Sequence, residues 1–332
     1  MHQSCGDAIV MTGSLTKPNP ESPSSKSPPG PAAIQLNRIL VPVDFSPASR
    51  HGVAFAAILG ERFQSRLHLL HVIEPPLLPQ WGYAHLARRD AKLSHAAAER
   101  MLQFPAESGI DPQLICSTDI LIGEADNKIC EAAAKNSSDL IVLASHGLGG
   151  LPHVVLGSTA ESVVRRAPCS VLTVRDCTIR ETGAGTPRFG LKRILVTTDF
   201  SNESKKAFPY AVALARRFDA SLVLLTVVPA HLPMGLGQIG SVYEEKRLLA
   251  EAHEQMPQFR QAEFDPELHV ETLVLNGGPA HEICRTAATL SVDLIVMATH
   301  GRTGLRHLVL GSMTEHVVRH SPCPVLAVRE RQ

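Results

Sequence analysis

Two sequence patterns that mark large enzyme classes are missing from this chain of 332 residues. The pattern GxxxxGK[ST] of P-loop kinases does not occur. PVDFSPA stands where a dinucleotide dehydrogenase needs GxGxxG after its first strand. Neither enzyme class is therefore expected.

Excess charge and aromatic side chains are also missing. Lysine plus arginine number 32, as do aspartate plus glutamate, so the formal net charge is zero. Aromatic residues make up 4% of the chain, which leaves few platforms for stacking bases. Without a basic field to attract phosphates, we expect no nucleic-acid partner.

Cysteine pairs and long apolar runs are absent as well. None of the seven cysteines forms a C-x-x-C pair, so neither a zinc cage nor a redox motif is indicated. Their odd number in a long chain favours a reducing compartment. No apolar run approaches the roughly 20 residues that span a bilayer. The N-terminus lacks a basic patch followed by a hydrophobic stretch, so a secretory signal is not expected. We therefore expect a cytoplasmic protein that does not contact membranes.

The N-terminal segment 1–35 is rich in proline, serine and glycine, as in TKPNPESPSSKSPPGPAA. Such a segment buries too little apolar surface to offset the entropy of ordering it, so we predict a disordered tail. The remaining chain is predicted to form two domains, at 36–175 and 191–332, joined by a linker at 176–190.

An internal repeat is the basis for that division. Arg38 opens RILVPVDFS, and Arg193 opens RILVTTDFS. Asp139 opens DLIVLASHGLGGLPHVVLGS, and Asp293 opens DLIVMATHGRTGLRHLVLGS. Both ends of each half match, so each half is predicted to be a complete unit.

Each half alternates short apolar runs with longer amphipathic stretches. In the first half we predict strands at 38–43, 67–73, 114–120, 139–144 and 170–174, and helices at 47–63, 85–108, 125–136 and 158–166. In the second half we predict strands at 193–198, 221–228, 268–274, 293–298 and 324–328, with the same alternation. Runs such as LIVLA are apolar on both faces, as in parallel strands covered by helices on both sides. The expected fold class is α/β: two repeated doubly wound, Rossmann-like, five-stranded parallel sheets with strand order 3-2-1-4-5.

A carboxylate follows the first strand of each half, at the sheet edge where ligands bind in such folds. Asp44 is followed by Ser46 and Pro47, which are typical of a helix start. Asp199 and Ser201 occupy the same places in the second half. Each aspartate could accept hydrogen bonds from a ligand or could merely support the turn into the helix.

A glycine-containing loop follows the fourth strand of each half. Gly157 and Gly311 precede helices whose free N–H groups suit a phosphate chain. The alternative is purely structural, because Ser158 to Glu161 and Ser312 to Glu315 match the capping-box pattern. Two histidines in these loops, His146 and His300, could contact phosphate or could stabilise the turn.

These motifs resemble the universal stress protein family, over about residues 38–175 and 192–329. Its nucleotide-binding members carry G-x2-G-x9-G-[ST] after the fourth strand. The second and third glycines are present here, while alanine replaces the first glycine in both copies, at Ala144 and Ala298. The GGPAHEI segment of the second copy is closer to the family pattern than GEADNKI in the first.

The resemblance implies one nucleotide site in each half. The aspartates and the valines of the second strand would lie beside the adenine, the glycines after the third strand near the ribose, and the loop residues around the phosphates. The implied binding residues are Asp44, Val72, Gly123, Ala144, His146, Gly147, Gly157, Ser158, Thr159, Asp199, Val227, Gly277, Ala298, His300, Gly301, Gly311, Ser312 and Met313.

The resemblance also implies a function: an ATP-binding regulatory protein of the stress response that is not an enzyme. The alternative is an interaction scaffold of the same fold that does not bind nucleotide. Asp44 or Asp199 could hold Mg²⁺ with the ATP, and slow hydrolysis is not expected to be the main activity. In this family the last strands pair between subunits, so the two halves are expected to pair within the chain. Association of two chains into a homodimer is left open. Cys169 and Cys323, at the start of those strands, are expected to be small buried residues, with a redox role as the alternative.

Overall fold

The computed structural model describes residues 34–75, 86–145, 156–175, 180–181, 187–188, 190–230, 239–300 and 311–330. Nearly all of the predicted tail and most of the predicted linker lie outside these ranges. Within the linker, two short segments pair as an antiparallel hairpin that the sequence did not predict, β6 (Arg180–Glu181) and β7 (Pro187–Arg188).

The first half alternates strands and helices as predicted, with ends that differ from the expectation by no more than a few residues. In chain order its elements are β1 (Arg38–Pro42), α1 (Pro47–Phe63), β2 (Arg66–Ile73), α2 (Leu86–Glu107), a short 3₁₀ helix (Pro112–Leu114), β3 (Ile115–Ile122), α3 (Ala125–Lys135), β4 (Leu140–Ala144), α4 (Ser158–Arg166) and β5 (Ser170–Val174).

The second half repeats this order with one change. Its elements are β8 (Arg193–Thr197), α5 (Asn202–Lys205), α6 (Phe208–Phe218), β9 (Ser221–Pro229), α7 (Ile239–Glu263), β10 (Val270–Gly277), α8 (Pro279–Thr289), β11 (Leu294–Ala298), α9 (Ser312–His320) and β12 (Val325–Val328). Where the first half has the single helix α1, the second half has α5 and α6. Pro209, in the first turn of α6, has no N–H to continue the ladder of α5, which explains the break.

All ten long strands form one sheet in the order β10-β9-β8-β11-β12-β5-β4-β1-β2-β3. Each half has the predicted order 3-2-1-4-5 and is parallel throughout. The halves join where β5 and β12 pair in antiparallel fashion, with Leu172 opposite Leu326. The expected pairing of the last strands within one chain is therefore confirmed, and it merges the two predicted sheets into one.

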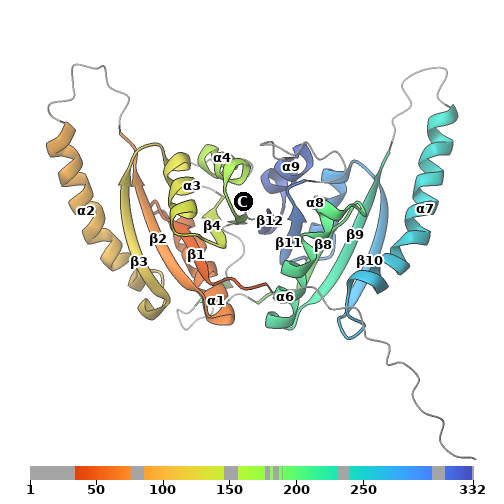
Figure 1. Cartoon of the computed structure of the whole chain (residues 1–332), viewed down its shortest axis with the longest axis horizontal. Helices are drawn as coiled ribbons and strands as arrows, with labels where there is room; N and C mark the ends of the chain where they lie inside the picture. Colours follow the sequence, from red (N-terminus) through yellow and green to blue (C-terminus); the bar gives the residue numbers. More distant parts are fainter. Residues whose placement is uncertain are drawn as a thin grey trace, which may run out of the picture.

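Helices cover both faces of this sheet and bury alternate residues of each strand (Figure 1). On β1, Ile39 and Val41 belong to a core packed against α1 and α2, while Leu40 belongs to the core on the α3 and α4 side. In the view of Figure 1, α2 and α7 lie at the outer ends of the molecule, and α4 and α9 lie near the middle. The helices that follow the glycine loops therefore lie beside the seam between the domains.

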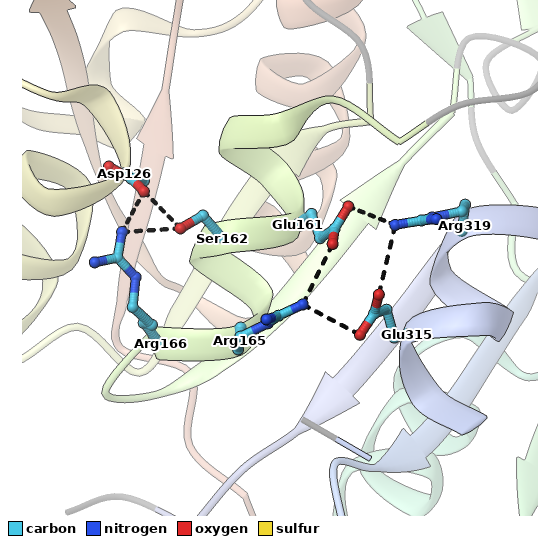
Figure 2. A network of polar contacts seen from close by, with 7 residues as sticks. All are labelled: Asp126, Glu161, Ser162, Arg165, Arg166, Glu315 and Arg319. Atoms are coloured by element: carbon cyan, nitrogen blue, oxygen red, sulfur yellow. Dashed lines mark hydrogen bonds and ion pairs between the residues drawn. The ribbon is translucent and has the colours of Figure 1, made fainter. Parts of the chain in front are cut away.

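Four charged side chains join α4 and α9 across this seam (Figure 2). The Nη2 atom of Arg165 lies 3.3 Å from Oε1 of Glu161 and 3.3 Å from Oε2 of Glu315. Arg319 lies 2.6 Å from Glu161 and 3.5 Å from Glu315. We call these four residues the seam ion-pair ring. The repeat places the same two residue types on each helix, so the ring has approximate two-fold symmetry.

The other face of the sheet carries a second symmetric contact between the halves. Arg62 at the end of α1 lies 5.4 Å from the ring of Phe218, and Arg217 at the end of α6 lies 5.4 Å from the ring of Phe63. Each guanidinium also donates to the other arginine's backbone carbonyl, at 3.4 and 3.0 Å. Both faces of the seam are thus bridged by matched pairs of residues.

Candidate functional site

A cavity of about 460 Å³ opens in the second domain, at the carboxyl ends of β8, β9 and β11. It is lined by the ends of these strands, by the residues that follow β8 and β11, and by Pro279 and Ile283 of α8. One face of α7 and the first turn of α9 form its walls. This is the sheet edge at which the sequence predicted a ligand, where the strand order reverses between β8 and β11.

Most of the predicted binding residues of the second copy line this cavity: Asp199, Val227, Ala298, His300, Gly311, Ser312 and Met313. Gly277 is not among its lining residues, whereas Pro279, two positions later, is. Gly301 lies outside the described residues. The fold therefore brings together side chains from the first, second and fourth strands of the domain, as the resemblance implied.

Asp199 supports the turn after β8 and also lines the cavity. It follows β8 in a turn in which Phe200 adopts a left-handed conformation, with φ of 64°. Its Oδ1 accepts hydrogen bonds from the backbone N–H of Ser201 at 3.0 Å and from the Ser201 hydroxyl at 2.5 Å. Because Asp199 also lines the cavity, support of the turn and contact with a ligand are compatible.

The wall opposite Asp199 begins at Gly311, which is the N-cap of α9. The backbone N–H of Gly311 donates to the carbonyl of Thr299 at 3.2 Å, which holds the start of α9 against the end of β11. Ser312 and Met313 in the first turn also line the cavity. The first N–H groups of a helix and its positive dipole end favour an anion at this position.

The capping boxes proposed as the structural alternative are wrong in both copies. The N-caps are Gly157 and Gly311, so Ser158 and Ser312 are the first helical residues. The glutamates that would complete the boxes, Glu161 and Glu315, instead pair with arginines in the seam ion-pair ring. The glycine caps leave the first turn of each helix without a side-chain cap.

His300 lines the cavity just beyond the end of β11. Its Nδ1 lies 3.0 Å from the hydroxyl of Thr299. Its Nε2 is buried and has no hydrogen-bond partner among the described residues. Because water can enter the cavity but does not reach this atom, Nε2 faces the protein interior and not the open cavity.

Sequence reasoning missed the contribution of α7. Leu248, Glu251, Ala252 and Gln255 line the cavity from this helix, and Thr226 lines it from β9. The spacing of these four α7 residues places them on one helical face, but which face of the helix packs over the sheet depends on the tertiary structure. The second-helix regions match poorly between the two halves, and the resemblance to the family gave no residue there.

Comparison with known proteins shows the family of the chain. The family model described as "Universal stress protein family" matches residues 35–175 and again 190–329. The chain belongs to the universal stress protein family. A universal stress protein of Mycolicibacterium smegmatis is 26% identical over 302 residues, which cover 88% of this chain and 97% of that protein. Universal stress protein MJ0531 of Methanocaldococcus jannaschii is 36% identical over 140 residues, which cover 42% of this chain and 82% of that protein.

A solved structure shows the same tandem fold. The crystal structure of a universal stress protein from Archaeoglobus fulgidus has a TM-score of 0.59 and 20% identity to this chain. The similarity covers 90% of this chain and 98% of that one. At this identity the comparison supports the shared fold.

The first domain of this universal stress protein places its predicted residues at the matching sheet edge. Asp44 Oδ1 accepts from the backbone N–H of Ser46 at 3.0 Å, as Asp199 does in its own turn. Gly157 donates to the carbonyl of Ser145 at 2.9 Å and begins α4. Val72 lies near the carboxyl end of β2, at the register position that Val227 has in β9. Ala144 is the last residue of β4, and Thr159 lies in the first turn of α4. His146 and Gly147 lie outside the described residues.

Gly123 and Gly277 have a backbone reason to be glycine. Their φ angles are +148° and +150°, a region that residues with a Cβ rarely adopt. A Cβ at Gly277 would approach the Cγ of Glu282 at 2.8 Å. The turn after the third strand therefore requires glycine in both domains of this universal stress protein.

The cysteines do not form a reactive cluster in the described parts of the chain. Cys169 and Cys323 are buried, as expected for small core residues. Burial raises the pKa of the Cys130 and Cys284 thiols, which keeps them protonated. No group of three or more His, Cys, Asp or Glu side chains there is arranged to hold a metal ion. None of the helices among these residues has the length and apolar composition to cross a membrane.

Proposed function

We propose that this chain binds an adenine nucleotide, with ATP as the expected ligand, in the cavity of the second domain. The observation that carries the proposal is that Asp199, the glycine-capped start of α9 and His300 line one cavity of about 460 Å³. Its volume is in the range of roughly 300–1,000 Å³ that small-molecule sites occupy.

The apolar part of the cavity suits a purine and its sugar. Leu225, Val227 and Ile283 present hydrocarbon surface, and a flat base gains free energy when it leaves water for such surface. Asp199 adds a carboxylate that accepts hydrogen bonds from the exocyclic amine or from the ribose hydroxyls. The combination of an apolar slot and one acceptor is what an adenosine needs.

The polar end of the cavity suits the phosphates. The first turn of α9, which has no side-chain cap, offers backbone N–H groups to the phosphates, and His300 lines the same cavity. Asp199 could hold a Mg²⁺ ion bound to the phosphates. Ala298, in place of the family's first glycine, adds one methyl group to the wall and narrows this end.

The proposed role is regulatory, in the stress response, and does not include catalysis. The described residues that line the cavity include neither lysine nor arginine to neutralise charge in phosphoryl transfer. The scattered cysteines of the sequence favour the reducing cytoplasm as the place of action.

Isothermal titration of the full chain with ATP, AMP and adenosine tests the proposal. We expect ATP to bind more tightly than adenosine, because only ATP reaches the first turn of α9. Asp199→Asn should weaken ATP binding about tenfold or more, since it removes a charged acceptor. The asparagine oxygen can still accept from Ser201, so the turn is retained.

If the folded wild-type chain gives no binding at millimolar ATP, the nucleotide function is wrong. The scaffold function of the same fold would then remain. Equal affinity for ATP and adenosine would instead contradict the assignment of α9 to the phosphates.

A further inference from the structure

The two domains differ at the positions that surround the phenylalanine after the first strand. Phe45 and Phe200 occupy the same place, and both adopt a left-handed conformation, with φ of 62° and 64°. Phe200 lines the cavity of the second domain. Phe45 is buried against side chains of its own domain.

The first difference lies on the second strand of each half. β1 and β8 pair with β2 and β9 in the same register, which places His71 of β2 where β9 has Thr226. Thr226 lines the cavity of the second domain. The imidazole of His71 packs against the ring of Phe45 in a tilted arrangement, with centroids 4.4 Å apart, and its Nδ1 lies 2.7 Å from the carbonyl oxygen of Val43.

The second difference lies on the long helix that covers the crevice. The buried residues Ala97, Met101 and Phe104 of α2 match Ala252, Met256 and Phe259 of α7. This alignment places Arg100 where α7 has Gln255, another residue that lines the cavity. The Arg100 guanidinium lies 4.8 Å from the Phe45 ring centroid, and its Nη2 donates to the Phe45 carbonyl at 3.4 Å.

We infer that the chain holds one adenine nucleotide, in the second domain, because His71 and Arg100 close the matching crevice of the first domain. The inference rests on the proposed function and goes beyond it by assigning the number of sites and the residues that decide it. In the second domain a small hydroxyl and a neutral amide leave room beside Phe200.

Entry of a base into the first crevice would displace both side chains. The ligand would have to break the hydrogen bond of His71 with Val43, and the contacts of Arg100 with the ring and carbonyl of Phe45. The contacts of the base with Phe45 would only replace the contacts that His71 and Arg100 already make with that ring. The broken hydrogen bonds would therefore not be offset. Asp44 accepts the same backbone hydrogen bond in the first domain as Asp199 does in the second. In this inference the aspartate alone is therefore not sufficient for a site.

Stoichiometry measured on the full chain tests the inference. We expect equilibrium dialysis with ATP to give one site per chain. Asp199→Asn should weaken that site, whereas Asp44→Asn should leave it unchanged. The two substitutions are matched, because both aspartates bond to the backbone N–H two residues later at 3.0 Å.

Exchange of the deciding residues gives a second test. The double variant Thr226→His with Gln255→Arg should weaken ATP binding roughly 10- to 100-fold, as overfilling a packed site does. The side chains come from the matching positions of the first domain, so the fold accommodates them there. The reverse variant His71→Thr with Arg100→Gln should give a second site.

The outcomes separate this inference from the proposed function. Two sites in the wild-type chain, or one site lost on Asp44→Asn, would overturn the asymmetry while nucleotide binding stands. No site at all would overturn both. Failure of the reverse variant to gain a site would contradict the closing role of His71 and Arg100. Photolabelling of the wild-type chain with an azido-ATP, followed by peptide mapping, needs no variant: label on first-domain peptides would also overturn the inference.

Discussion

The Glu161 carboxylate in α4 accepts a hydrogen bond from Arg319 in α9 at 2.6 Å, which joins two helices that belong to different domains (Figure 2). Each of these helices begins at a glycine cap beside a strand end, at Gly157 or Gly311. The seam ion-pair ring therefore connects the two segments that the sequence assigned to phosphate binding. Glu161 and Glu315, which occupy the last position of the expected capping boxes, pair with arginines of the other domain.

Removal of Arg319 should loosen this seam. Arg319→Ala leaves Glu161 and Glu315 facing each other with one cation between them, and we expect the free energy of unfolding to fall by roughly 1 kcal/mol, since the ring is partly exposed to solvent. Arg165→Ala should cost less, because both of its contacts are 3.3 Å long and neither is as short as the 2.6 Å contact of Arg319 with Glu161. Urea unfolding of both variants, in a double-mutant cycle with Glu161→Gln, measures the coupling. Strict additivity of Arg319→Ala and Glu161→Gln would show that the pair contributes nothing.

The strand pairing at the seam should contribute more than the ion pairs. Leu326 lies opposite Leu172 and both are buried, so Leu326→Ala should destabilise the chain by about 2–5 kcal/mol. Leu102→Ala is the control, because Leu102 is 79% exposed, and it should change stability little. Thermal or urea unfolding compares them. If the two substitutions cost the same, the seam is not part of the cooperative core.

Glycine is required at position 277 but not at the next position. Gly277→Ala forces a Cβ into a left-handed backbone and within 2.8 Å of Glu282, so a loss of about 1–3 kcal/mol is expected. At Gly278 the nearest atom to a Cβ would be 3.8 Å away, which is ordinary contact. Gly278→Ala should therefore leave the unfolding midpoint nearly unchanged. A similar loss for both substitutions would refute the conformational argument.

The sequence predicted the fold well because each half repeats the same signals. Runs such as LIVLA and LIVMA became β4 and β11, and proline at position 47 marked the start of α1. The second half was expected to repeat the elements of the first, but near Pro209 the helix that corresponds to α1 is divided into α5 and α6. A repeat predicts shared elements, and it predicts local departures less well.

The candidate site was predicted in part. The aspartate and the glycine cap could be found, because strand ends and helix starts have recognisable residues. The contributions of Gln255 and Arg100 could not be found, since they depend on which face of a long helix packs over the sheet. The effect of His71 required the register of β2 against β1 and the place of Phe45, and both are tertiary facts.

His68 in β2 gives the chain a predictable dependence on pH. Its side chain is buried, with Nε2 3.0 Å from the Asp119 carboxylate. Burial lowers the pKa of His68 below its ordinary value of 6.5, although the charge of Asp119 acts in the opposite direction. The unfolded chain therefore binds this proton more readily than the folded chain does. The contribution of neutral His68 to stability is present above pH 6.5 and is lost as pH falls through the lowered pKa.

His68→Val tests this dependence, because the second domain carries buried Val223 at the same register. As the pH falls from about 8 to about 5, we expect the free energy of unfolding of the variant to rise relative to that of the wild type, since valine takes up no proton. His95→Gln is the control, because His95 is exposed on α2, and it should follow the wild-type curve. Urea unfolding at several pH values measures all three chains. If the difference in the free energy of unfolding between His68→Val and the wild type stays constant over this range, the burial of neutral His68 does not make stability depend on pH.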